Sequence, residues 1–209
     1  MDNPIKKGDI RPKARSQPPG QIKIMNALRS LLEEKEFSAI TWEEIAKTAG
    51  VNEGLIYKYF KDSRNLLHQV LKEYLEDYVE RLKFDLKGIE GALNKLRKFI
   101  WSSLNTYNSD RVFAKILLLE VRNFPGYFQS GTYQLVQAYA KIILEIIDEG
   151  IKSGEIRDDI SPKLLRQAIL GCIEHFCLPG IIFERELSPD ALTKDICKIL
   201  FDQIGQKHG

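Results

Sequence analysis

Long apolar runs are missing from this chain of 209 residues. The longest unbroken run, from Ile116 to Leu119, has four residues, whereas a membrane-spanning helix needs roughly 20. The segment 1–20 carries five basic residues and four prolines but no apolar stretch, so it lacks the core of a secretory signal. We expect a cytoplasmic protein without a transmembrane segment or a membrane partner.

Cysteine is scarce as well. Cys172, Cys177 and Cys197 are an odd number in a chain long enough to need no disulfide staples, and we expect them to be reduced core residues. Cys172, His175 and Cys177 lie close in sequence, but within one helix their side chains do not all converge, and no fourth ligand is evident. The sequence therefore predicts no metal site and no cofactor.

The sequence motifs of common enzymes are also absent. We find no nucleophile elbow, phosphate loop, dinucleotide fingerprint or HExxH spacing. The sequence therefore predicts that the protein is not an enzyme.

Proline is distributed unevenly, and none occurs from Gly20 to Phe124. That interval is free to be helical, and its apolar residues recur at spacings of three and four, as in Leu93, Leu96, Ile100 and Leu104. No Asn-Gly or Asp-Gly pair marks a β-hairpin. These patterns predict an all-α fold.

Capping signals place the helix ends. Thr41 and Glu44 have the spacing of a capping box, and Ser161-Pro162 and Ser188-Pro189 each place a hydroxyl before a proline suited to the first helical position. We predict about nine helices, spanning approximately 21–37, 41–49, 52–59, 63–86, 89–107, 110–123, 132–152, 161–182 and 188–204.

The most informative segment runs from Thr41 to Phe60. It combines a capped helix, a tight turn at Gly50 and a second short helix, which together predict a helix-turn-helix. Small and apolar residues form the inner faces of the two helices, so that they can cross closely: Ile45, Ala46, Ala49, Val51, Ile56 and Phe60.

The outward groups of this segment suit DNA. Asn52 can pair with an adenine edge, and Leu55 can pack on a thymine methyl. Hydroxyl and ammonium groups can hold phosphates, and Gly54 permits a close approach of the backbone. The free amides of the helix that Thr41 caps can receive a phosphate. The predicted DNA-binding residues are Thr41, Asn52, Glu53, Gly54, Leu55, Tyr57, Lys58, Tyr59 and Lys61.

The charge balance adds to this interpretation. Basic and acidic residues number 31 and 29 in the whole chain, so bulk charge does not drive nucleic-acid binding. Residues 1–67 hold 12 basic and 9 acidic residues, and this excess lies in the segment 1–20, which has five basic and two acidic residues. We predict a flexible basic arm there, which either reaches into a minor groove or is a solvated tail.

The order and spacing of these residues resemble the DNA-binding domain of the tetracycline-repressor (TetR) family of transcription regulators. The resemblance covers about residues 21–67, with Asp62-Ser63-Arg64 where the family often has a lysine. It is carried by Phe37, Thr41, Ile45, Ala46, Ala49-Gly50-Val51, Gly54, Leu55-Ile56-Tyr57, Tyr59-Phe60 and Leu66-Leu67.

The resemblance implies a two-part homodimeric regulator. Residues 21–67 would bind a palindromic operator in double-stranded DNA, and residues 68–209 would form an effector pocket and a dimer interface. Most family members are repressors that a small molecule releases from DNA. An acidic Glu53 where DNA would lie keeps open a small-molecule binding protein that no longer touches DNA, and a ligand-dependent activator would have the same architecture.

The second part of the chain supplies candidates for an effector pocket, although core packing explains most of its aromatic residues. The candidates are Trp101, Tyr107, Glu120, Phe124, Phe128, Tyr133, Gln137, Glu174, His175 and Phe176. A further resemblance, to acyl-CoA-responsive repressors of fatty-acid degradation, is carried by Glu120-Val121-Arg122-Asn123, Tyr139, Glu149-Gly150, Gly154-Glu155 and Gly171-Cys172-Ile173-Glu174. It implies a hydrophobic effector.

The last two predicted helices have broad apolar faces. These faces either cover the core or, as the family resemblance implies, pair with their copies in a four-helix dimer interface. The predicted interface residues are Leu165, Ile169, Ile173, Leu192, Ile196 and Leu200.

Overall fold

The computed structural model describes residues 17–204, and all regular elements in that range are helices, which confirms the all-α prediction. The predicted arm lies mostly outside the described residues, and its last two positions begin the first helix. Nine α-helices occur in the described range: α1 (Pro19–Glu34), α2 (Trp42–Ala49), α3 (Glu53–Tyr59), α4 (Ser63–Leu86), α5 (Ala92–Ser109), α6 (Arg111–Lys115), α7 (Gly131–Ser153), α8 (Pro162–Ile182) and α9 (Pro189–Ile204).

Three short helices of other types join them. A 3-10 helix, η1 (Phe37–Ala39), follows α1, and another, η3 (Pro125–Gln129), precedes α7. A π-helix, η2 (Ile116–Glu120), continues directly from α6. The single helix predicted over 110–123 is therefore a short α-helix that widens into a π-helix.

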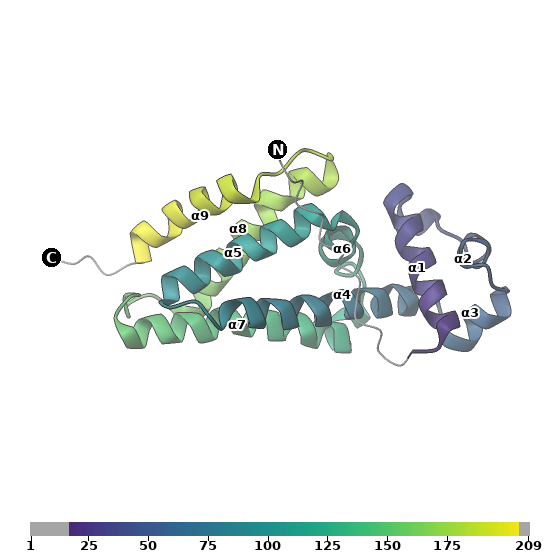
Figure 1. Ribbon diagram of the computed structural model, residues 1–209, viewed down its shortest axis with the longest axis horizontal. Coiled ribbons are helices and arrows are strands. Elements are labelled where there is room, and N and C mark those ends of the chain that lie inside the picture. The colour runs from purple at the N-terminus through teal and green to yellow at the C-terminus, as the bar shows by residue number, and fades with distance from the viewer. Residues whose placement is uncertain (1–16, 205–209) are drawn as a thin grey trace, which may run out of the picture.

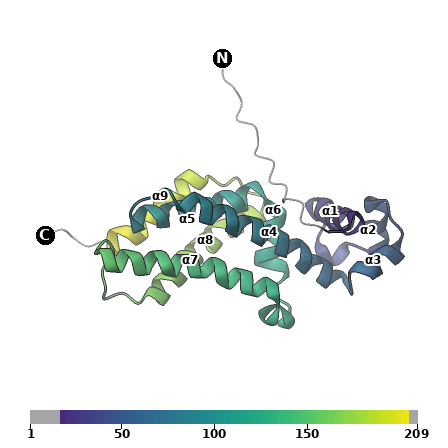
Figure 2. The same cartoon turned by 60° about the horizontal axis from the view of Figure 1, so that its bottom comes forward.

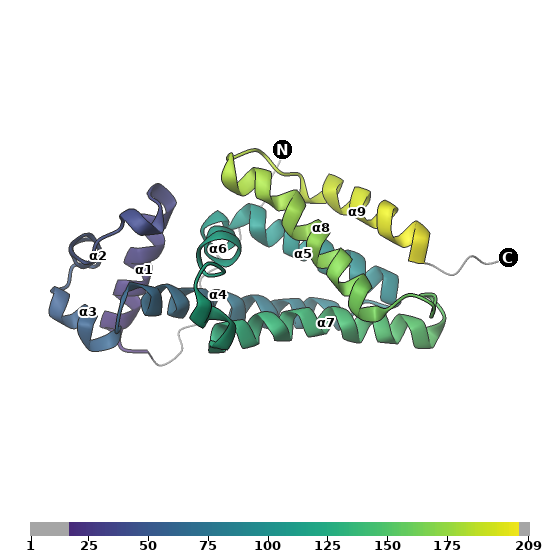
Figure 3. The same cartoon turned by 180° about the vertical axis from the view of Figure 1, so that it is seen from behind.

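The helices form two parts (Figure 1). We call α1, α2 and α3 the head and α5 to α9 the body. Helix α4 starts beside the head and runs along the body next to α7, as the view from behind also shows (Figure 3). With 24 residues, α4 is about 36 Å long. It is the longest helix in the described range and connects the two parts.

The local signals predicted for the head are confirmed. The amide of Glu44 donates to Thr41 Oγ1 at 3.2 Å, and the amide of Thr41 donates to Glu44 Oε2 at 3.0 Å, which completes the capping box. Gly50 ends α2 in the left-handed conformation with φ 66°, which a residue without Cβ adopts at little cost. The head therefore contains the predicted helix-turn-helix (Figure 2).

Polar contacts join the head to α4 and to the body. Arg29 of α1 pairs with Glu73 of α4 at 2.5 Å and stacks over the Tyr74 ring at 4.7 Å. Lys115, the last residue of α6, pairs with Glu36, which follows α1, at 2.6 Å. A shift of α4 or α6 would therefore be transmitted to the head.

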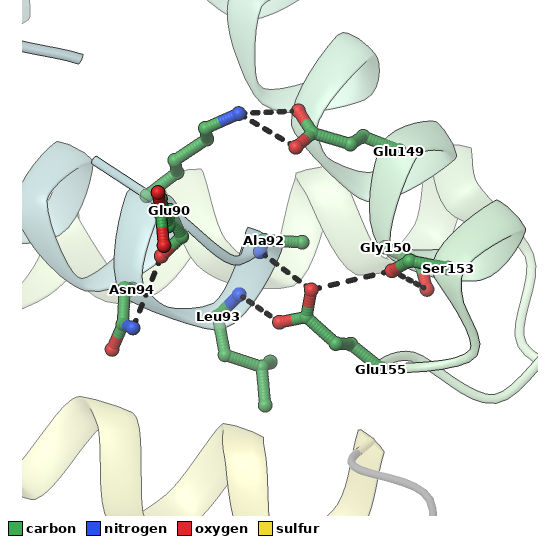
Figure 4. A network of polar contacts seen from close by, with 9 residues as sticks. Glu90, Ala92, Leu93, Asn94, Glu149, Gly150, Ser153 and Glu155 are labelled. Carbon is green, nitrogen blue, oxygen red and sulfur yellow. Dashed lines mark hydrogen bonds and ion pairs between the residues drawn. The ribbon is translucent and has the colours of Figure 1, made fainter. Parts of the chain in front are cut away.

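A carboxylate from a distant loop caps α5. The residue before this helix, Gly91, offers no side chain, and Glu155 instead accepts the amides of Ala92 at 3.1 Å and Leu93 at 3.3 Å. These hydrogen bonds lower the pKa of Glu155. Figure 4 shows the carboxylate facing the amino end of α5, with Ser153 beside it.

Close packing at the same place requires glycine at position 150. A Cβ atom there would lie 2.6 Å from Ile156 Cδ1 and 2.7 Å from Ala92 Cβ. Gly154 ends α7 in the left-handed conformation with φ 77°. The run from Glu149 to Glu155, which carries part of the second resemblance, therefore serves to join α5 to α7.

Helix α8 is long and apolar, although no long unbroken apolar run marks it in the sequence. Within the described range, it alone is long and apolar enough to cross a membrane by length and composition. Counting unbroken apolar runs misses it because polar residues such as Glu174 and His175 interrupt the helix. Its inner face packs on α5 and α7, and a third of its most apolar window is buried.

Candidate DNA-binding and effector sites

The surface of α3 presents a continuous polar face. Asn52, Glu53, Gly54, Lys58 and Lys61 are exposed, and Tyr57, also on this face, is 58% exposed. The Trp42 ring at the start of α2 lies 5.8 Å from the Tyr57 ring, so packing restricts where the phenol points. This face combines a hydroxyl and two ammonium groups in the pattern that binds a DNA backbone.

Three predicted DNA contacts need correction. Asn52 Oδ1 accepts the amide of Leu55 at 2.9 Å; the side chain thus caps α3, and its oxygen is not free for an adenine. Leu55 and Tyr59 are half-buried against the core, and a Cβ at Gly20 would lie 2.9 Å from Leu55 Cδ2. Leu55 and Tyr59 lie four positions apart, so their side chains share one side of α3. That side faces α1, where Gly20 lies next to both of them.

Thr41 and Glu53 also have local roles. Thr41 caps α2 through its hydroxyl. Glu53 is an acidic residue in the first turn of α3, where a negative charge stabilises the positive end of the helix dipole. Glu53 therefore has a structural explanation and gives little support to a head that no longer contacts DNA.

The ten predicted effector residues do not converge on one cavity. Trp101 donates from Nε1 to Asp190 at 2.8 Å and so ties α5 to α9. Four others are exposed, on three different helices: Phe128 on η3, Gln137 on α7, and His175 and Phe176 on α8. Tyr107 is buried in the body core, and Tyr133 packs against its edge. The predicted set therefore mixes core residues, surface residues and one residue that links two helices. A single sequence does not show which face of each helix points inward.

One of these residues, Glu174, belongs to a half-buried ion pair. Glu174 of α8 accepts two hydrogen bonds from Arg122, at 2.7 and 2.8 Å. The carboxylate raises the pKa of Arg122. Burial raises the pKa of Tyr127 and of Cys177, each to about 12. This fork-to-fork ion pair lies beside the neutral phenol of Tyr127 and the neutral thiol of Cys177.

Glu120 lies at the end of the π-helix η2, two residues before Arg122. Burial and the nearby carboxylate of Glu36 raise its pKa. The π-helix thus lies between Lys115, which contacts the head, and Arg122, which contacts α8. Wider helical turns of this kind are often found at functional sites.

A pocket of about 460 Å³ lies where α4 meets the start of α7. Of the predicted effector residues only Phe124 lines it, and Lys61 is its only predicted DNA-binding residue. The sequence carries one signal for this pocket: Arg64, His68 and Lys72 are spaced by four positions and therefore lie on one face of α4. The pocket is lined by Lys61, Asp62, Arg64, Asn65, His68, Gln69, Lys72, Phe124, Gly126, Ser130, Gly131 and Thr132.

The predicted dimer residues are mostly inside the chain. Leu165, Ile169, Ile173 and Ile196 are buried in the core of the single chain, and Leu192 and Leu200 pack against that core, half-buried. The prediction of these four buried residues as interface is therefore wrong, because the strongest apolar stripe of each helix faces its own body. The opposite side of the two helices is the exposed one, with Leu164, Ala168, Gly171, Phe176 and Ile199.

The cysteines are free thiols, as predicted. Cys177 and Cys197 are buried and Cys172 is half-buried, and burial raises the pKa of all three thiols. Among residues 17–204, no three His, Cys, Asp or Glu side chains are grouped to hold a metal ion.

Known proteins resemble this chain over most of its length. The fatty acid metabolism regulator protein of Bacillus subtilis is 28% identical over 189 residues, which cover 90% of this chain and 97% of that protein. The solved structures that share the fold include two FadR proteins. FadR of Bacillus subtilis in complex with stearoyl-CoA has a TM-score of 0.78 at 28% identity, over 86% of this chain and 97% of that chain. FadR of Bacillus halodurans has a TM-score of 0.79 at 20% identity, over 90% and 97%.

Two family profiles match adjoining parts of the chain. Residues 24–70 match the bacterial regulatory proteins of the tetR family. Residues 64–202 match the C-terminal region of YsiA-like proteins. These matches confirm the predicted resemblance and the interpretation as a regulator and not an enzyme. The chain belongs to the TetR family of bacterial transcriptional regulators and has a YsiA-like C-terminal region.

Proposed function

We propose that the protein is a cytoplasmic repressor that binds a palindromic operator as a homodimer and leaves it when a long-chain acyl-CoA binds the body. The observation that carries this proposal is the likeness, over 86% of this chain, to a FadR structure that holds stearoyl-CoA. The exposed polar face of α3 supplies the DNA-binding part.

The head supports DNA binding through α3. The exposed side chains on α3 and directly after it are Tyr57, Lys58 and Lys61. With the helix in a major groove, these groups contact phosphates and base edges along it. Two heads related by a two-fold axis would read half-sites about 34 Å apart, or a multiple of that spacing.

The exposed side of α8 and α9 supports dimer formation. Leu164 is 66% exposed and Ile199 is 58% exposed. Phe176 is also exposed on this side of α8, after the small residues Ala168 and Gly171. An apolar surface of this extent on helices that are already packed on one side is typical of a protein interface. The pairing of α8 and α9 with their copies would also account for the apolar composition of α8.

Release from DNA requires that the effector prefer one arrangement of the heads. A ligand with equal affinity for both arrangements would shift nothing. The contacts that couple the two parts are Arg29 with Glu73 and Lys115 with Glu36. Because η2 follows Lys115 directly, a change in the body near Arg122 reaches the head through α6.

The test is a selection of genomic fragments with the full chain at a stated salt concentration, followed by titration of stearoyl-CoA into the complex with the enriched sequence. We expect an enriched palindrome and its release by stearoyl-CoA, but not by stearate or coenzyme A alone at equal concentration. Stronger binding with stearoyl-CoA would indicate a co-repressor. Absence of any enriched sequence, with a folded dimer, would refute DNA binding and favour a small-molecule binding protein that no longer touches DNA.

A further inference from the structure

The pocket between α4 and α7 is not explained by the DNA-binding face or by the body core. It lies at the junction of head and body and has a volume of about 460 Å³, which is in the range of small-molecule sites. We propose that this pocket binds the phosphate groups of the effector. This inference rests on the proposed function, because it assigns a place to the charged end of an acyl-CoA.

The charge of the pocket favours an anion. Lys61, Arg64 and Lys72 line it, and Asp62 is the one acidic residue among its lining. The Asp62 carboxylate is already engaged, since it accepts the amide of Asn65 at 2.7 Å as the cap of α4. Three cations therefore face a space with one carboxylate, and arginine and lysine are the residues that bind phosphate in proteins.

His68 supplies a polar group without a partner. Its Nδ1 atom is buried and has no hydrogen-bond partner among the described residues. The ring stacks on Tyr127 at a centroid distance of 6.1 Å and an interplanar angle of 17°. A buried polar atom without a partner is unfavourable. Rotation of the ring toward a phosphate oxygen would lose no hydrogen bond at this atom and would gain one.

The start of α7 forms the opposite wall. Ser130 caps this helix by accepting the amide of Tyr133 at 3.1 Å, and Gly131 and Thr132 line the pocket. A Cβ at Gly131 would meet nothing within 4 Å, so the backbone there is open to a ligand. The first amides of a helix and its dipole favour a phosphate. Thr132 Oγ1 donates to His68 O at 3.5 Å, which holds α7 against α4.

Binding at this place would oppose DNA binding. Lys61 lines the pocket and is also exposed beside the DNA-facing surface of α3. A phosphate bound in the pocket would attract the ammonium group that otherwise contacts the DNA backbone, and its negative charge would repel DNA phosphates. The pocket would thus link effector occupancy directly to the head.

The experiment compares three probes on the full chain. These are stearoyl-CoA, stearoyl-pantetheine, which keeps the thioester and the acyl chain but has no phosphate, and inorganic pyrophosphate. The variants are Lys72→Gln and Arg64→Gln. The matched control is Lys83→Gln, an exposed lysine farther along the same helix. Calorimetric titration gives the affinities, and the melting temperature shows that each variant is folded.

We expect Lys72→Gln and Arg64→Gln each to weaken stearoyl-CoA binding about 10-fold, the effect of losing one charge-assisted hydrogen bond. Stearoyl-pantetheine binding should be unchanged in both variants, and Lys83→Gln should behave as the wild type. Equal losses for the two thioesters, or no loss for either, would overturn the proposal.

Pyrophosphate separates this inference from the proposed function. If the wild type does not bind stearoyl-CoA, the proposed effector is wrong. Pyrophosphate binding that Lys72→Gln weakens would still support a phosphate site, here for another phosphorylated molecule. Absence of pyrophosphate binding in a wild type that binds both thioesters equally well would overturn the site and leave the effector intact.

Discussion

The head and the body of this protein differ in how their residues are organised. In the head, each functional group is close in sequence to the groups that position it: Thr41 caps α2 three residues before Glu44, and Asn52 caps α3. In the body, the key contacts join distant segments, as Glu155 does with Ala92. A helix-turn-helix is therefore recognised from local spacing, whereas the body is held together by contacts that a local pattern does not reveal.

The largest effect is expected at a long-range contact of the body. Gly150→Val would force a side chain into Ile156 and Ala92, and overpacking of this kind costs about 3 kcal/mol of unfolding free energy. Gly131→Ala, at the start of the same helix and with open space around it, is the matched control. Chemical denaturation measures both variants. An equal and small effect at the two positions would contradict the packing of α5 against α7.

The proposed dimer face gives the next largest effect. Phe176→Glu introduces a charge on the exposed side of α8 and should weaken the dimer by about 2 kcal/mol, the lower bound for an interface hot spot. Phe84→Glu is the control, since Phe84 is 75% exposed on α4. Sedimentation of the variants at several concentrations gives the dissociation constants. Dissociation by Phe84→Glu, with no change at Phe176, would move the interface to α4.

The recognition helix should lose DNA affinity without loss of fold. Tyr57→Ala or Lys58→Ala removes an exposed group of α3, and we expect operator binding to weaken about 10-fold for each, or about 1.4 kcal/mol. Lys83→Ala on the body portion of α4 should leave it unchanged. Fluorescence anisotropy at matched salt measures the affinity. Wild-type affinity in both α3 variants would remove this helix from the DNA interface.

The Glu155 cap provides a pH-dependent test of the body. Hydrogen bonds from the amides of Ala92 and Leu93 lower the pKa of Glu155. The ionised carboxylate therefore stabilises the folded protein at pH values above the ordinary pKa of a glutamate, and this stabilisation is lost as the pH falls through the lowered pKa. Glu155→Gln should reduce stability by about 1 kcal/mol at pH 7, as loss of a helix cap does. The difference from the wild type should shrink toward pH 3. A difference that stays constant with pH would show that the charge of Glu155 does not contribute.

These two regions also show what the sequence can predict. The span of α4 and the caps of α2 and α8 follow from periodicity, Ser, Thr and Gly, because these signals act within one turn of helix. The sequence does not show in the same way which face of each helix is buried. The stripe containing Ile169 looks like an interface but is the core. The pocket at His68 forms only when α4 and α7 come together, and the contact between His68 and Thr132 joins residues 64 positions apart.

The smallest expected effect tests which contacts of the head carry sequence information. Lys61 is exposed beside α3, and a lysine that contacts only phosphates adds the same energy on every DNA sequence. Lys61→Gln should therefore weaken binding to the operator and to unrelated DNA by the same few-fold factor, and the slope of log affinity against log salt should become shallower by about one unit. Titrations of both DNAs between low and moderate salt measure this change, with Lys83→Gln as the control. Selective loss for the operator would instead show that Lys61 reads a base edge, and the division between positioning and reading groups in the head would then have to be redrawn.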